Sequence, residues 1–206
     1  DMGVCVVGLG ASTTTMAVYE NGELLHAATF LIGSDHITAD IAITLRTSIE
    51  VAEKIKRTKG NAVPGNFSSQ DTIDLKDYGS ETQEIIELSF IAEVIEARLE
   101  EMLEKVEEEL KSIDRSGLLP SGVVLTGGGS KLPGIVEVVK NILHLPASIG
   151  VPNLDSSIPE LVKDPAFSTA VGLVAWGFEA EKQFDQPGGL YGRSLKQAGG
   201  LVAKIS

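Results

Sequence analysis

Two glycine-rich segments carry the residues best suited to chemistry. The first, Gly8-Leu9-Gly10-Ala11-Ser12-Thr13-Thr14, directly follows an apolar run at residues 4–7. Backbone N–H groups in such a turn can converge on an anion, and the hydroxyl groups add donors. The second, Gly127-Gly128-Gly129-Ser130, follows an apolar run at residues 122–126 and lacks every Cβ where a flat ring or a sugar could lie. Each segment alone is also typical of an ordinary turn, but the two together favour a phosphate or nucleotide site.

Other recognisable site patterns are missing from the sequence. No Gly-Lys-Ser/Thr follows either segment, and the triple glycine lacks the spacing of a dinucleotide-binding fingerprint. His26, His36 and His144 lie far apart, so we predict no metal site from histidine or cysteine. The single cysteine, Cys5, lies in an apolar run, which favours a small buried side chain over a nucleophile. One cysteine allows no intramolecular disulfide, so the cytosol is the default compartment.

Composition and charge indicate a folded, acidic protein. The chain has 206 residues, with 17 Lys and Arg against 29 Asp and Glu, which gives a formal net charge of −12. Its 43% hydrophobic and 22% charged residues are ordinary for a chain that buries a core. The acidic balance argues against a nucleic-acid surface, because phosphate neutralisation needs clustered Lys and Arg. The length allows one large domain or two small ones.

The first half of the chain predicts three strands and two helices. Strands at 4–7, 15–19 and 24–31 form a meander, with Asn21-Gly22 as a hairpin turn. Ser34 or Asp35 is expected to cap a first helix. Thr47-Ser48-Ile49-Glu50 has the form of a capping box, which predicts a second helix that runs to about residue 58 and ends at Gly60.

The second half predicts a small β layer, a long helix and a second strand-loop-helix unit. Residues 72–75 and 84–88 are short strand candidates, and residues 89–112 form an amphipathic helix with an acidic face, either solvated or used for a partner. A strand at 122–126 precedes a helix at 133–143, a strand at 147–151 and a helix at 167–178. The tail from residue 183 onward is expected to be unpacked.

Both glycine-rich segments resemble motifs of the actin, Hsp70 and sugar-kinase superfamily, in the same order. The first is similar to its second phosphate loop, and Val124-Leu125-Thr126-Gly127-Gly128-Gly129-Ser130-Lys131-Leu132-Pro133-Gly134 to its adenosine motif. Glu53-Lys54-Ile55-Lys56-Arg57 resembles the segment whose charged side chains reach ribose and adenine; an exposed helix end is the alternative. The nucleotide-site residues that the resemblance implies are Gly10, Ala11, Ser12, Thr13, Thr14, Gly33, Glu53, Lys56, Arg57, Gly127, Gly128, Gly129, Ser130 and Leu132.

Within that superfamily the chain most resembles the FtsA family of bacterial cell-division actin homologues, over about residues 4–180. Three further segments carry this likeness: His36-Ile37-Thr38-Ala39-Asp40-Ile41-Ala42, Ala52-Glu53-Lys54-Ile55-Lys56 and Phe167-Ser168-Thr169-Ala170-Val171-Gly172-Leu173. The PilM family of type IV pilus assembly adaptors shares the loops and is the alternative. A small-molecule kinase of the superfamily is a third hypothesis, although no catalytic carboxylate can be placed beside a substrate pocket.

The resemblance implies an α/β fold that is the second lobe of an actin-like (ribonuclease H-like) ATPase, with a mixed sheet, flanking helices and a small inserted α+β subdomain. Residues 1–46 and 113–180 would form the nucleotide-facing subdomain, residues 47–112 the inserted one and residues 181–206 a flexible tail. ATP is the expected cofactor. Gly8 stands where the family carries an acidic residue, which puts Mg²⁺ binding in question. We therefore expect weak or no ATPase activity, and none from this chain alone.

The resemblance also implies partners and a location. It predicts FtsZ binding through residues 47–112, self-association into filaments, and a place at the division septum on the inner face of the bacterial cell membrane. Membrane contact would come from a C-terminal helix, which is a weak candidate here because Gly199-Gly200 interrupts its apolar face. No nucleic acid is expected as a partner.

Overall fold

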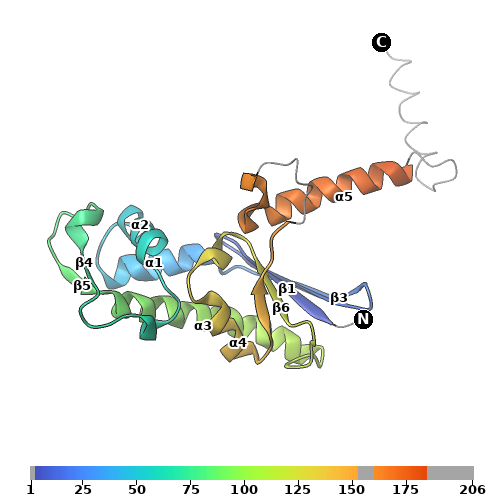
Figure 1. Cartoon of the computed structure of the whole chain (residues 1–206), viewed down its shortest axis with the longest axis horizontal. Coiled ribbons are helices and arrows are strands. Elements are labelled where there is room, and N and C mark those ends of the chain that lie inside the picture. The colour runs from blue at the N-terminus through green and yellow to red at the C-terminus, as the bar shows by residue number, and fades with distance from the viewer. Residues whose placement is uncertain (1–2, 153–159, 185–206) are drawn as a thin grey trace, which may run out of the picture. The chain divides into compact units, whose positions relative to one another are not determined.

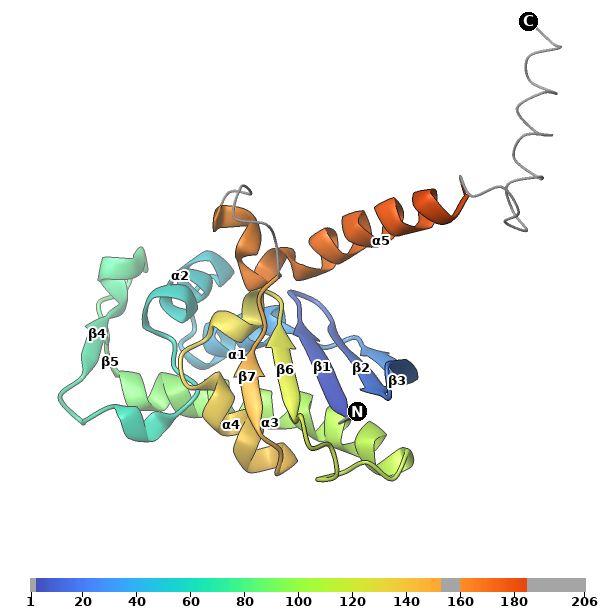
Figure 2. The ribbon, with the colours of Figure 1, turned by 45° about the vertical axis from the view of Figure 1, so that its right-hand side comes forward.

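A five-stranded mixed sheet forms the centre of the larger of two compact units. The computed structural model describes residues 3–152 and 160–184, and the chain divides at Val151/Pro152. The strands run in the order β3-β2-β1-β6-β7, as Figure 2 shows. Their bounds are β1 Val4–Leu9, β2 Thr14–Glu20, β3 Glu23–Phe30, β6 Val123–Thr126 and β7 Ala147–Ile149. The first three strands form the expected antiparallel meander, whereas β6 pairs in parallel with both β1 and β7.

One face of this sheet holds the core. Side chains alternate along a strand, so Cys5, Val7 and Leu9 of β1 are buried while Val4 and Val6 on the opposite face are half-buried. Burial raises the pKa of the Cys5 thiol to about 12, because the thiolate would lose its hydration. The prediction that Cys5 is a buried apolar residue is therefore confirmed.

Helices cover the buried face. Figure 1 shows α3 (Leu88–Ser112) and α4 (Ile135–Leu143) side by side on one side of the sheet, and α1 (Ser34–Thr44) also packs against α3. Arg98 of α3 donates to both carboxylate oxygens of Asp40 on α1, at 2.5 and 2.9 Å. Arg115, which follows α3, pairs with Glu20 of β2 at 2.6 Å. These pairs tie α3 to α1 near the middle of the helix, and tie the segment just after α3 to β2.

The segment between α1 and α3 contains one helix, two short helical turns and a small sheet of its own. Helix α2 (Ile49–Lys59) is followed by the short helical turns η1 (Pro64–Asn66) and η2 (Leu75–Tyr78) and by a separate two-stranded sheet. The strands of this sheet are β4, Thr72–Asp74, and β5, Ile85–Glu87. The sequence placed these strands correctly to within two residues at each end.

Three expectations about helix starts are wrong in detail. The N-cap of α1 is Gly33 rather than Ser34 or Asp35, and its N–H donates to His36 Nδ1. Helix α2 begins after Ser48, one residue later than the Thr47 box predicts, and the Ser48 hydroxyl accepts from the Val51 N–H. Helix α4 begins at Ile135 instead of 133, because the turn η3 (Gly128–Lys131) and a left-handed Gly134, with φ of 82°, precede it.

The smaller unit contributes the turns η4 (Glu160–Lys163) and η5 (Pro165–Phe167) and the helix α5 (Ser168–Phe184). Helix α5 runs six residues beyond the expected end at 178. Within residues 3–152 and 160–184, no helix is both long and apolar enough to cross a membrane. The predicted tail helix lies outside the described residues.

Candidate functional site

The two glycine-rich segments lie side by side because β1 and β6 are parallel neighbours. Gly8 of β1 is in register with Thr126 of β6, so both strands end at the same edge of the sheet. Figure 2 shows the two carboxyl ends next to each other. Loops that leave this edge of a parallel strand pair are the usual place for ligand binding in α/β sheets. The strand order thus brings together segments that are distant in the sequence.

The turn between β1 and β2 is docked onto the start of α1. The Gly10 N–H donates to the Thr13 carbonyl at 2.9 Å, which closes the turn. The N–H groups of Ser34 and Asp35 donate to the Gly10 and Ala11 carbonyls at 2.9 and 2.8 Å. Because the turn uses these helix N–H groups, the first turn of α1 is not an open anion site. The N–H donors to a bound anion would have to come from the β1–β2 turn itself.

Two further predicted site residues, Gly33 and Thr14, support this turn from its buried side. A Cβ at Gly33 would lie 2.4 Å from the Ala11 carbonyl oxygen, so this glycine is required by packing. Thr14 is buried, and its hydroxyl donates to the Ile32 carbonyl at 2.8 Å. Ala11 and Ser12 are exposed, and the Ser12 hydroxyl donates to the Asp35 carboxylate at 3.2 Å. The exposed part of the turn is therefore limited to its tip.

The three glycines after β6 have different surroundings. Gly127 has a φ of 84°, and a Cβ there would lie 2.5 Å from the Leu9 carbonyl oxygen. At Gly129 a Cβ would lie 2.5 Å from the Ser34 hydroxyl. Gly128, between them, is exposed and has no heavy atom within 4 Å of its Cβ position. Only Gly128 therefore offers open backbone against which a ring could lie, whereas its neighbours pack the loop against β1 and α1.

Ser130 and Leu132 complete the loop. Ser130 is fully buried, and its hydroxyl donates to the Gly127 carbonyl at 2.7 Å, which makes it a support for the loop. A Cβ at Gly60, the C-cap of α2, would lie 3.2 Å from the Leu132 side chain. The adenosine-type loop therefore contacts the end of α2, the helix that carries the predicted charged residues.

The charged residues of α2 form a network that reaches α1. Lys56 Nζ lies 2.6 Å from Glu53 Oε2 and donates to the Thr38 hydroxyl at 2.7 Å and to the Ser34 carbonyl at 3.0 Å. The Thr38 hydroxyl donates to Glu53 Oε2 at 2.6 Å. Only 12% of the Lys56 side chain is exposed, against 40% for Glu53. The Lys56 ammonium thus makes its hydrogen bonds inside the protein, whereas the Glu53 side chain still faces solvent.

The electrostatics of this network keep Glu53 ionised. Burial raises the pKa of Glu53, but the hydrogen bonds from Lys56 and Thr38 and the positive charges of Lys56 and Arg57 outweigh that effect. The pKa of Glu53 therefore lies below its ordinary value. Arg57 is exposed on the same helix, where its guanidinium remains accessible.

The residues predicted for the site lie on the β1–β2 turn, the β6–α4 loop, the N-cap of α1 and helix α2. The start of α1 contacts the turn and the loop, α1 packs against α2, and the loop also contacts the end of α2. Sequence reasoning missed Ser34, Asp35 and Thr38 as members of this cluster. Their types are suggestive, since two carry hydroxyls and one a carboxylate, but nothing in the local pattern connects the start of α1 with Lys56. That connection exists only through the packing of α1 against α2.

The residues present do not supply the acidic Mg²⁺ ligand of the wider superfamily. At Gly8, where that carboxylate would stand, a Cβ would lie 2.6 Å from the Thr15 hydroxyl. Among the residues that the structure describes, no three His, Cys, Asp or Glu side chains gather into a group that could hold a metal ion. We therefore derive no metal-assisted step.

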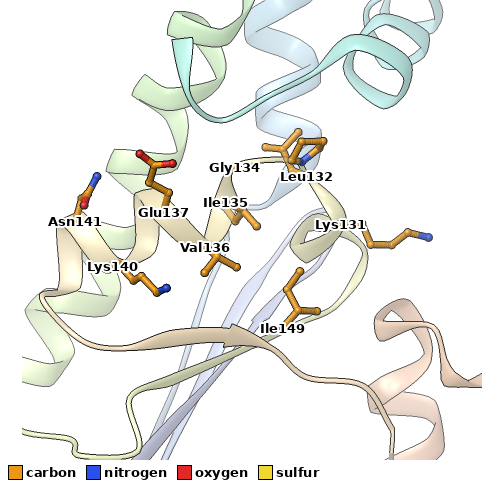
Figure 3. Close-up of a pocket in the computed structure, with 10 residues that line it drawn as sticks. Lys131, Leu132, Gly134, Ile135, Val136, Glu137, Lys140, Asn141 and Ile149 are labelled. Atoms are coloured by element: carbon orange, nitrogen blue, oxygen red, sulfur yellow. The ribbon is translucent and has the colours of Figure 1, made fainter. Parts of the chain in front are cut away.

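A separate hollow lies between η3, α4 and the edge strand β7. It has a volume of about 510 Å³, and Figure 3 shows Val136 and Ile149 facing each other across it, with Lys131 and Lys140 at its sides. Of the predicted site residues, only Leu132 lines it. This hollow therefore does not coincide with the cluster around Gly128 and Glu53.

Solved structures identify the class of fold. The chain superposes on MreB5 of Spiroplasma citri bound to ADP with a TM-score of 0.70 and 18% identity, over 90% of this chain and 56% of that one. It superposes on the PilM–PilN type IV pilus biogenesis complex with a TM-score of 0.63 and 22% identity, over 86% of this chain and 46% of the other. These likenesses show the fold alone, and that fold is actin-like. The predicted α/β actin-like fold with a mixed sheet and flanking helices is confirmed.

Sequence comparison then identifies the family. The family model described as cell division protein FtsA matches residues 5–172. The cell division protein FtsA of Pseudomonas aeruginosa is 35% identical over 181 residues, which cover 88% of this chain and 43% of the relative. The chain belongs to the FtsA family, as its segments predicted. It spans less than half the length of that relative.

Proposed function

We propose that the chain binds an adenine nucleotide beside Gly128 and Glu53 and acts in cell division as part of an FtsA-type protein. The observation that carries this proposal is the open backbone at Gly128, which lies on a loop that packs against the end of β1, the start of α1 and the end of α2. Family membership supports the role in cell division. The structures of MreB5 bound to ADP and AMPPNP support nucleotide binding by this fold.

In the proposed complex each part of the cluster has one task. The base lies against the backbone at Gly128, where no side chain intervenes. The ribose hydroxyls donate to the ionised Glu53, and the exposed guanidinium of Arg57 adds a positive charge nearby. The phosphates lie toward the tip of the β1–β2 turn, where Ala11 and Ser12 are exposed.

ATP binding to the 206-residue chain, measured by isothermal titration calorimetry, tests this proposal. Gly128→Leu fills the open space at the loop and is expected to weaken ATP binding at least tenfold without lowering the melting temperature. Gly65→Leu is the matched control, because Gly65 is also exposed with nothing within 4 Å of its Cβ position but lies on η1. Absence of ATP and ADP binding by the unmutated chain at millimolar ligand would refute the proposal.

We further propose that the region 47–112 is a small inserted subdomain that binds FtsZ. Its surface carries exposed apolar side chains on α2, β5 and α3, with exposed fractions of 54% for Ile49, 62% for Ile85 and 43% for Phe90. Exposed apolar side chains that form a contiguous patch are typical of a protein-binding surface, and these three side chains are the candidates for such a patch. Residues 1–46 and 113–180 are then the nucleotide-facing subdomain.

Capture of purified FtsZ by the immobilised 206-residue chain tests the partner. Ile85→Asp is expected to abolish capture. Ile43→Asp is expected to preserve it, because Ile43 is 75% exposed on α1, outside the region. Equal capture by both variants would place the FtsZ contact elsewhere on the chain.

Self-association into filaments and action at the septal membrane complete the proposal for the whole protein. FtsA relatives and the actin-like fold support the first. Sedimentation of the chain with and without ATP tests self-association, and vesicle flotation tests the membrane contact. The pilus-adaptor and kinase alternatives are not proposed, because the family model that matches the chain is FtsA.

A further inference from the structure

Thr38 occupies the centre of the network between α1 and α2. It is only 3% exposed, and its Oγ1 lies 2.6 Å from Glu53 Oε2, 2.7 Å from Lys56 Nζ and 3.3 Å from the Ser34 carbonyl oxygen. A threonine hydroxyl has one proton to donate, whereas the Lys56 ammonium can only donate and an ionised carboxylate can only accept. The Thr38 hydroxyl therefore donates its proton to Glu53 Oε2, because this acceptor lies closer than the Ser34 carbonyl oxygen. Lys56 in turn donates to the Thr38 oxygen.

This arrangement gives the two oxygens of Glu53 different roles. Oε2 receives the hydrogen bond from Thr38 and the contact with Lys56. Within the described residues no hydrogen-bond partner is found for Oε1, and 40% of the Glu53 side chain faces solvent. Without the Thr38 hydroxyl, Lys56 alone would hold the carboxylate, and a single flexible ammonium does not fix the plane of a carboxylate.

We propose that Thr38 is a positioning residue that commits one carboxylate oxygen of Glu53, so that the other oxygen is presented to the two ribose hydroxyls of a nucleotide. This inference rests on the proposed nucleotide site. Thr38 itself is too buried to touch the ligand, and it acts through Glu53. The site then prefers ligands with a vicinal diol, because such ligands supply two hydroxyl donors to the oriented oxygen.

A ligand-by-residue cycle tests the proposal, with ATP and 2′,3′-dideoxy-ATP as probes of the 206-residue chain. Thr38→Val keeps the shape but removes the hydroxyl, and Thr38→Ser keeps the hydroxyl. ATP binding is expected to weaken about tenfold in Thr38→Val, the equivalent of one charge-assisted hydrogen bond, and to stay within about twofold in Thr38→Ser. Binding of the dideoxy probe is expected to be the same in all three proteins.

A second measurement needs no nucleotide and therefore tests the positioning of Glu53 separately from nucleotide binding. The carboxyl carbon of Glu53, followed by carbon-13 NMR, is expected to titrate at higher pH in Thr38→Val than in the unmutated chain, because one of the hydrogen bonds that lower its pKa is lost. Thr38→Ser should restore the original titration. If Thr38→Val does not fold, Thr38→Ala serves for both measurements, since it also removes the hydroxyl.

The outcomes are distinct. Equal loss of ATP and dideoxy-ATP binding in Thr38→Val, or no loss of either, overturns the positioning role. Equal affinity of the unmutated chain for the two probes also overturns it, while nucleotide binding itself stands. Failure of the unmutated chain to bind any nucleotide overturns the proposed function, and a Glu53 titration that Thr38→Val leaves unchanged overturns the positioning of the carboxylate independently.

Discussion

Gly127 packs the loop against β1, whereas Gly128 leaves open space, and stability measurements alone can test this difference. Alanine at Gly127 would have to adopt a φ of 84° and would place its Cβ 2.5 Å from the Leu9 carbonyl oxygen, in the backbone of β1. With a φ of 84° and a ψ of 170°, Gly127 lies in a region that only glycine ordinarily adopts, which costs an L-residue about 1–3 kcal/mol. Displacing backbone to relieve the contact adds about 1 kcal/mol, so Gly127→Ala is expected to lower the free energy of unfolding by about 2–4 kcal/mol.

Two matched variants separate these contributions. Gly22 has a φ of 80° but nothing within 4 Å of its Cβ position, so Gly22→Ala reports the cost of a positive φ without a steric contact, about 1–2 kcal/mol. Gly128 has neither the left-handed φ nor a neighbour, so Gly128→Ala is expected to change stability by less than ~0.5 kcal/mol. The expected order of destabilisation is Gly127→Ala, then Gly22→Ala, then Gly128→Ala.

Urea denaturation followed by far-ultraviolet circular dichroism measures all three variants. For a chain of this length the Gly127→Ala effect corresponds to a fall in melting temperature of roughly 5–15 °C. A Gly127→Ala variant no less stable than Gly22→Ala would show that the loop moves away from β1 without cost. The assignment of Gly127 to packing against β1 would then be wrong.

Three further predictions concern reactivity, pH and turnover. The Cys5 thiol, with its pKa raised to about 12 by burial, is expected not to react with a thiol reagent at pH 8 until urea unfolds the chain; labelling of the native protein at the rate of free cysteine contradicts this. Because the folded pKa of Glu53 is lowered, its charge stabilises the fold above the unfolded pKa, near 4.5, and this stability is lost as pH falls through the folded pKa. The difference in urea midpoint between the unmutated chain and Glu53→Gln should therefore be present at pH 7 and shrink toward pH 3, and a pH-independent difference argues against it. Finally, the purified chain is expected to show no Mg²⁺-dependent ATPase activity, since Gly8 offers no carboxylate; a rate above background disproves this.

The sequence predicted the order and type of the regular elements well where local chemistry decides them. Asn21-Gly22 marked the hairpin because both residues accept a positive φ, and both do so in the structure, at 51° and 80°. The apolar runs before each glycine segment became β1 and β6. Helix starts were predicted less accurately, because several neighbouring polar residues can act as a cap and the chain path selects one of them. Gly33 became the cap of α1 because the β1–β2 turn lies against it and leaves no room for a Cβ.

The sequence by itself determined the family, the fold class and the segments that make up the candidate site, because motif order and periodicity are written along the chain. Only the tertiary structure decided what each residue does there. Whether a glycine serves packing or leaves room for a ligand depends on its distance from Leu9 and Ser34, which lie far away in the sequence. Likewise, Lys56 turned inward and Thr38 joined the network because α1 packs against α2, and no local pattern encodes contacts between two helices.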